Sequence, residues 1–161
     1  MSQHSLQGNF EIFDASSYRV GIVVAMFNAD VSAQLLKSAQ DMCALYGIKP
    51  ENITVHEVPG SVEIPFVLST LAKSNKSFDA LVALGTIIEG ETPHFEYVCK
   101  IVSEGVLRVT LDSNIPIGFG VLTCKNHTQA LERIETGGTA VRAVLNSVKI
   151  AQEYDIQNTT N

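Results

Sequence analysis

Short apolar runs alternate with longer amphipathic stretches along this chain. Four of the apolar runs have the length and composition of strands, and they cover residues 20–25, 53–58, 80–84 and 115–121. Continuous apolar runs are typical of parallel strands that are covered on both faces. Apolar positions at helical spacing predict helices from Asn28 or Asp30 to Tyr46, after Pro59-Gly60, over 93–108, after Asn126, and over 139–154.

Strands that alternate with helices predict an α/β fold with right-handed crossovers. We expect a four-stranded parallel sheet inside a three-layer αβα sandwich of the flavodoxin-like type. The length of 161 residues predicts a single domain over 1–161, with an N-terminal arm over 1–17 and a frayed polar tail over 156–161.

In open parallel sheets, ligands bind beyond the carboxyl ends of the strands. The segments at or just after the ends of the four predicted strands are therefore the candidates for a site. We expect them to meet at one edge of the sheet, and they are residues 26–28, 59–63, 86–94 and 119–123.

Composition and charge exclude some classes of partner and some cellular locations. The formal net charge is −6 and the pI is about 5.1, which argues against nucleic acid, because phosphate backbones require a basic surface. No apolar run approaches the roughly 20 residues of a membrane span, and we see no signal peptide. Three widely spaced cysteines without a CxxC motif fit a reducing compartment. We expect a soluble, cytoplasmic protein without a structural metal.

The stretch from Gly85 to Tyr97 carries the clearest chemical signal. A strand, a glycine-containing turn and a helix start follow one another there, an arrangement whose backbone N–H groups suit a phosphate. The Thr92 hydroxyl can cap the helix, and Pro93 fits its first position. His94 then lies beside the anion site, where an imidazole can exchange protons with a phosphorylated substrate. By itself, a lone histidine near a helix start is more often inert.

Four motifs together resemble the lumazine synthase family. They are Phe27-Asn28, the stretch VPGSVEIP at 58–65, the stretch from Leu84-Gly85-Thr86 to GETPHFEY at 90–97, and PIGFGVLT at 116–123 with QALER at 129–133. The resemblance covers about Tyr18 to Ile150. It implies condensation of 5-amino-6-(D-ribitylamino)uracil with 3,4-dihydroxy-2-butanone 4-phosphate to 6,7-dimethyl-8-ribityllumazine, with release of phosphate and water. It also implies that the reaction needs no metal or organic cofactor.

The resemblance implies a role for each candidate residue. His94 would transfer protons, Arg133 would supply charge to the phosphate, and Phe27 would stack on the pyrimidine ring. We expect Leu131 and Ile134 to face inward from the helix that follows Asn126. Arg133 lies about 200° around that helix from Leu131, so it points away from its own core and could serve a neighbouring subunit. Backbone and hydroxyl groups of the turn would bind phosphate, and these residues are Gly90, Glu91 and Thr92. The remaining substrate-binding candidates are Ser61, Val62, Glu63, Thr86, Ile87, Ile88 and Phe119.

The resemblance also implies a homo-oligomer built on a five-subunit ring, with Phe119 closing a neighbour's pocket. The favoured state is the pentamer, and an icosahedral assembly of 60 subunits stays open.

Three departures from the family pattern bear on function. Val62 replaces an aromatic residue, Glu89 adds negative charge, and the stretch 136–140 lacks the usual lysine. These departures leave an alternative open, namely a flavodoxin-like binding module or a catalytically weak homologue that binds lumazine or flavin.

Overall fold

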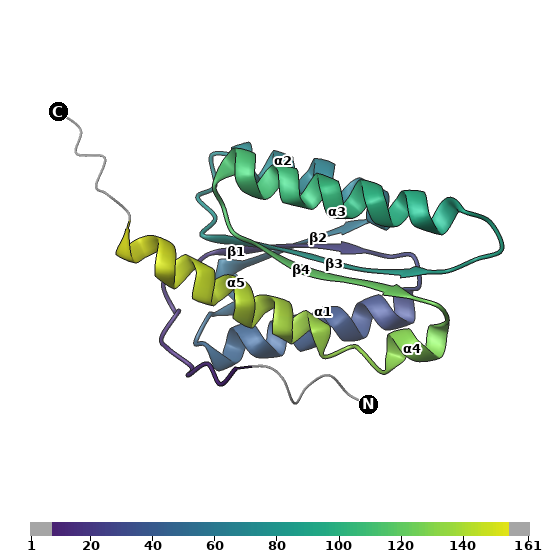
Figure 1. Ribbon diagram of the computed structural model, residues 1–161. Helices are drawn as coiled ribbons and strands as arrows, with labels where there is room; N and C mark the ends of the chain where they lie inside the picture. The colour runs from purple at the N-terminus through teal and green to yellow at the C-terminus, as the bar shows by residue number, and fades with distance from the viewer. Residues whose placement is uncertain (1–7, 155–161) are drawn as a thin grey trace.

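Four parallel strands form the centre of the molecule, and two layers of helices cover them (Figure 1). The computed structural model describes residues 8–154. The expected tail at 156–161 and the first seven residues of the expected N-terminal arm lie outside the described residues. The strand order is β2-β1-β3-β4, and the strands are β1 (Val20–Ala25), β2 (Ile53–Val58), β3 (Ala80–Ile88) and β4 (Ile117–Cys124).

The helices divide between the two faces of the sheet. In Figure 1, α2 and α3 lie above the sheet, and α1, α4 and α5 lie below it. Their bounds are α1 (Ala29–Leu45), α2 (Ile64–Lys73), α3 (His94–Ser113), α4 (His127–Leu131) and α5 (Thr136–Glu153), with short 3₁₀ helices at Pro50–Asn52 and Ser61–Glu63. This arrangement confirms the predicted α/β sandwich.

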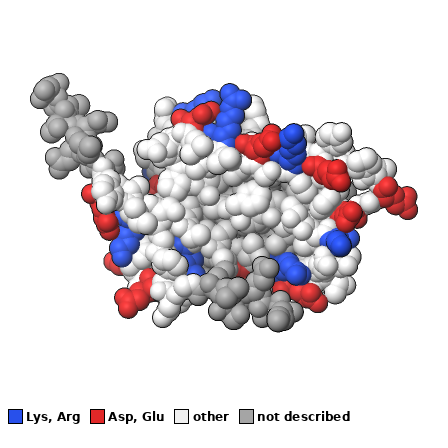
Figure 2. Space-filling model, viewed as in Figure 1, with Lys and Arg blue, Asp and Glu red and all other residues white. Residues whose placement is uncertain are grey.

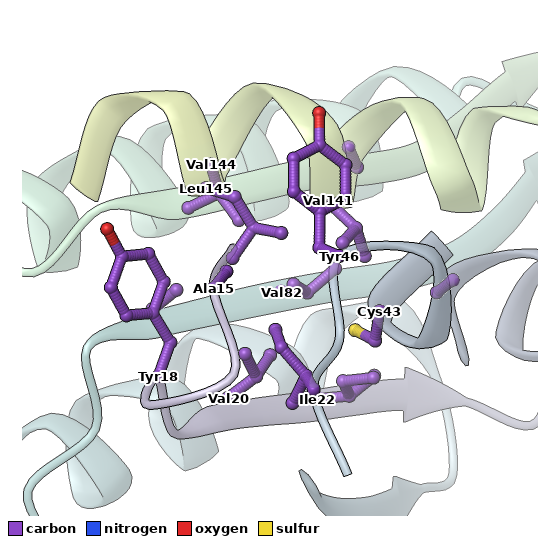
Figure 3. Packing of buried hydrophobic residues seen from close by; sticks show 14 of the residues in the cluster. Ala15, Tyr18, Val20, Ile22, Cys43, Tyr46, Val82, Val141, Val144 and Leu145 are labelled. Carbon is purple, nitrogen blue, oxygen red and sulfur yellow. The ribbon is translucent and has the colours of Figure 1, made fainter. Parts of the chain in front are cut away.

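Apolar side chains from both faces of the sheet make two large clusters. Under α1 and α5, Val20, Ile22 and Val82 from the strands pack with residues of both helices, as Figure 3 shows. Under α2 and α3, the alternate strand positions Val23, Leu81 and Ala83 do the same. Strands that bury both faces keep the continuous apolar pattern from which they were predicted.

Part of the expected N-terminal arm packs against this core. The Ala15 N–H donates to the Tyr46 carbonyl at 2.9 Å, and the rings of Phe13 and Tyr46 lie edge to face at 5.1 Å. Lys149 from α5 places its ammonium 4.8 Å from the centre of the Phe13 ring. These contacts hold residues 13–15 against α1 and α5.

Several predicted boundaries were wrong. β3 continues to Ile88, so Thr86, Ile87 and Ile88 belong to the strand and not to the turn. β4 runs over 117–124 instead of the predicted 115–121, so Leu122 and Thr123 belong to the strand, and Phe119 lies within it opposite Ala83. A longer strand is stable here because β3 and β4 pair with each other through to Ile88 and Cys124.

The bounds of the last two helices of the chain, α4 and α5, also differ from prediction. α4 ends at Leu131, so Arg133 follows that helix and does not lie in it. Leu131 is 37% exposed, and Ala130 is the buried residue that faces the core. α5 begins at Thr136, three residues before the predicted start, because Gly137 and Gly138 pack directly on α1.

Candidate active site

A cavity of about 300 Å³ opens at the carboxyl ends of β1, β2 and β3. The strand arrowheads and the beginning of α3 lie at the right of Figure 1, which locates this edge of the sheet. The lining residues come from all three strand ends and from the first turns of the following helices. They are Phe27, Gly60, Ser61, Val62, Glu63, Thr86, Ile87, Ile88, Gly90, Thr92, His94, Phe95 and Val98.

The end of β3 provides an open strand edge beside the cavity. β1 pairs with β3 only as far as Val24 opposite Leu84, whereas β4 accompanies β3 to Ile88. The segment from Gly85 to Ile88 therefore has a strand partner on one side only. Backbone groups of a strand alternate between its two sides, and Thr86 and Ile88 face the side without a partner. Such an edge can hydrogen-bond a flat ring that carries its own donors and acceptors.

Gly85 allows the turn after β2 to lie directly on β3. A Cβ atom at this position would lie 2.7 Å from Ser61 Oγ and 3.2 Å from Ala25 Cβ. Ser61 is buried in this contact, at 6% exposure. The absent side chain therefore sets the distance between two walls of the cavity.

Glu63 is held in a fixed orientation at the same turn. Its Oε2 accepts a hydrogen bond from the Gly60 N–H at 2.9 Å. The lining contains this one carboxylate and no lysine or arginine among the described residues. A phosphate in the cavity would therefore need a cation from outside this lining.

Thr86 contributes a buried hydroxyl to the lining. The residue is 1% exposed, and its Oγ1 has no hydrogen-bond partner within the described part of the chain. A buried hydroxyl without a partner costs free energy, on the order of 1–3 kcal/mol. A bound molecule with a complementary polar group would remove that cost.

The turn between β3 and α3 brings Gly90, Thr92 and His94 to the cavity. α3 begins at His94, one residue later than predicted, and Thr92 Oγ1 accepts a hydrogen bond from the His94 N–H at 3.4 Å. The first N–H groups of this 20-residue helix point toward the turn, where the helix dipole favours an anion. His94 itself is exposed.

Three candidate residues do not line this cavity. Glu91 is exposed in the turn, and Phe119 lies on β4 with 43% of its surface exposed. Arg133 donates through Nη1 to the Gln129 carbonyl at 2.8 Å, and that nitrogen lies 3.5 Å from Glu132 Oε2. The arginine side chain is 51% exposed.

Sequence reasoning missed Gly60, Phe95 and Val98 as lining residues. His94 and Val98 are four positions apart on α3, so they lie on one face of the helix, and Phe95 is next to that face. Extending the helical period from His94 would have found Val98. Gly60 lines the cavity through its backbone, so no side-chain pattern reveals it.

Among all the described residues, the cavity included, no group of three His, Cys, Asp or Glu side chains could hold a metal ion. None of the described helices is both long enough and apolar enough to cross a membrane. Burial raises the pKa of the Cys43 thiol to about 11. Burial also raises the pKa of the Cys124 thiol, and the positive charge of Arg133 opposes that rise.

An α/β sandwich with a largely apolar cavity and a few polar groups beyond its strand ends is the general architecture of an enzyme that acts on a small molecule. Residues 17–152 match the family model described as 6,7-dimethyl-8-ribityllumazine synthase. A protein named 6,7-dimethyl-8-ribityllumazine synthase from Desulfatibacillum aliphaticivorans is 41% identical in an alignment of 145 positions that covers 87% of this chain and 93% of that relative. The chain belongs to the 6,7-dimethyl-8-ribityllumazine synthase family.

Proposed function

We propose that the protein condenses 5-amino-6-(D-ribitylamino)uracil with 3,4-dihydroxy-2-butanone 4-phosphate to form 6,7-dimethyl-8-ribityllumazine. The observation that carries this proposal is the composition of the cavity. It combines a strand edge and an aromatic ring for the pyrimidine, polar groups for the ribityl chain, and a helix start with a histidine for the phosphorylated partner. The family and the named relative agree with this activity.

The pyrimidine would lie against the open edge of β3, with Phe27 over its face. The two isoleucines, Ile87 and Ile88, supply the apolar wall, and the flat ring stacks on the phenyl group. Ser61, Val62 and Glu63 lie at the turn after β2, where the ribityl hydroxyls would be bound. The Glu63 carboxylate, oriented by the Gly60 N–H, is a strong acceptor for those hydroxyls.

The phosphate of the butanone would lie at the start of α3. Backbone N–H groups near Gly90 and Glu91 and the Thr92 hydroxyl are its donors there. Because the lining has no basic side chain, Arg133 of a neighbouring subunit is our candidate for the balancing charge. Its exposure on its own subunit leaves it accessible for that contact.

His94 would move the protons. The amino group of the pyrimidine adds to the ketone, and loss of water gives an imine. Loss of a proton from carbon and departure of phosphate follow, and ring closure with loss of a second water completes the product. An imidazole beside the phosphate can take up and return those protons near neutral pH.

A ring of five subunits with sites between neighbours would supply Arg133 and Phe119 to each cavity. Figure 2 shows a broad area without Lys, Arg, Asp or Glu in the middle of one face, and in the same view of Figure 1 β4 runs between α3 and α5 there. Further apolar side chains are exposed on α2 and α3, among them Phe66 (77%) and Leu111 (71%). Surfaces of this kind mark subunit contacts. A 60-subunit shell stays the alternative assembly.

Purified protein mixed with both substrates tests the activity, with lumazine followed by its absorbance or fluorescence. The butanone without its phosphate is the control, because it has no leaving group. We expect rapid product formation when the ribityl pyrimidine is mixed with the phosphorylated butanone, and not when the butanone lacks its phosphate. Product that forms no faster than without protein would contradict the proposed function and favour a binding protein.

A further inference from the structure

Asn28 connects two of the strand ends that surround the cavity, although its side chain is not part of the lining. It follows β1 with φ 61° and ψ 56°, in the left-handed region that asparagine tolerates better than most residues. Its Nδ2 donates to the Thr86 carbonyl on β3 at 3.1 Å. A single side chain therefore bridges the loop after β1 and the open edge of β3.

The backbone on the β1 side of this bridge determines where Phe27 lies. The Phe27 N–H donates to the Pro59 carbonyl at 3.0 Å, and Ser32 Oγ donates to the Ala25 carbonyl at 2.6 Å. The Phe27 side chain is 72% exposed, so packing does little to fix the ring. Its position depends instead on the loop, and the left-handed turn at Asn28 directs that loop into α1.

On the β3 side, the Asn28 amide binds the Thr86 carbonyl, which is the last carbonyl on this edge before Ile88, where the ring would be contacted. Thr86 and Ile88 face the side of β3 that has no strand partner. With the Thr86 carbonyl bound to Asn28, the backbone of Ile88 is the next group on that edge. The bridge therefore sets both the aromatic ring and the strand edge between which a flat molecule would lie.

We propose that Asn28 is a positioning residue for the ring-binding end of the cavity, acting through Phe27 and the edge of β3. This inference rests on the proposed function. It predicts that loss of the Asn28 amide weakens binding of the ribityl pyrimidine and leaves binding of the phosphorylated butanone unchanged, because the phosphate end of the cavity is built by the turn before α3.

The variant Asn28→Gly tests this, because glycine keeps the left-handed backbone and removes only the amide. We expect the KM for the ribityl pyrimidine to rise about threefold to tenfold, the effect of one lost neutral hydrogen bond, and the KM for the butanone to change by less than about twofold. The matched control is Asn114→Gly. Asn114 is the other left-handed asparagine among the described residues, at the end of α3, and its substitution should change neither KM.

Asn28→Asp provides a second test, because the aspartate keeps the size of the side chain but cannot donate to the Thr86 carbonyl. It should give the same separation of the two KM values. Parental KM values in both Asn28 variants, equal increases for both substrates, or the same increase in Asn114→Gly would overturn the proposal. A parent protein that makes no lumazine would instead overturn the proposed function, so the two failures are distinguishable.

Discussion

Replacing Gly85 by alanine places a methyl group between the two walls of the cavity. The new Cβ would lie 2.7 Å from Ser61 Oγ, 3.2 Å from Ala25 Cβ and 3.4 Å from Ile64 Cδ1. All three neighbours are buried, so the methyl group can be accommodated only if Ser61 and the elements around it shift away from β3. Overpacking of this kind costs about 1–3 kcal/mol of the free energy of unfolding.

Gly90→Ala is the matched control for this change. A Cβ at Gly90 has no heavy atom within 4 Å, so the variant differs from the parent mainly through the unfolded chain. Both substitutions reduce the freedom of that chain, which stabilises the folded state by about 0.4–1 kcal/mol. The difference between the two variants therefore isolates the clash, and we expect Gly85→Ala to be less stable by about 1–3 kcal/mol.

Thermal unfolding at one fixed protein concentration measures this difference. For a chain of this length it corresponds to a midpoint that is lower by roughly 2–4 °C per kcal/mol. Because Ser61 lines the cavity, we also expect a higher KM for the ribityl pyrimidine in Gly85→Ala. Equal midpoints for the two alanine variants would refute the conclusion that Gly85 sets the distance between the walls.

Three further predictions concern charge, pH and assembly. Arg133→Ala should raise the KM for the phosphorylated butanone roughly tenfold to a hundredfold, with less than about a twofold change in the KM for the ribityl pyrimidine. Arg108→Ala is the control. Equal effects of Arg133→Ala on both KM values would exclude a role of Arg133 in binding the phosphate. The Cys43 thiol keeps its proton in the folded state up to a pKa of about 11, so stability should fall as pH rises from the ordinary value of 9.0 toward 11, and Cys43→Ala should show a shallower fall in pH-dependent denaturation. Sedimentation at micromolar concentration should give a pentamer, and a monomer would contradict sites shared between subunits.

The order of strands and helices could be predicted because both faces of the sheet are buried. Continuous apolar runs such as residues 20–25 and 80–84 then identify the strands without reference to the rest of the chain. The ends of β3 and β4 could not be predicted in the same way. Their last residues are stabilised by pairing with each other, from Gly85 opposite Val121 to Ile88 opposite Cys124, and this is a tertiary contact.

The side chains of the cavity could be predicted mainly through the family motifs. Phe27, Ser61 and His94 lie in different segments, and the rule that strand ends meet at one edge brings them together. The contact of Gly85 with Ser61 and the bridge from Asn28 to Thr86 depend on distances between strands that no sequence spacing contains. The early start of α5 has a similar cause. A Cβ at Gly137 would collide with the Leu35 carbonyl, so this glycine-containing stretch packs here as the first turn of the helix.

The central claim is that the cavity beside His94 carries out the condensation. The most direct measurement is the rate of lumazine formation by His94→Ala, with His56→Ala as the control, because His56 is an exposed histidine on β2 that does not line the cavity. We expect His94→Ala to keep the parental fold and to be slower by about 10- to 10⁴-fold, with some turnover left from substrate positioning, while His56→Ala keeps the parental rate. A folded His94→Ala that makes lumazine as fast as the parent would contradict the claim.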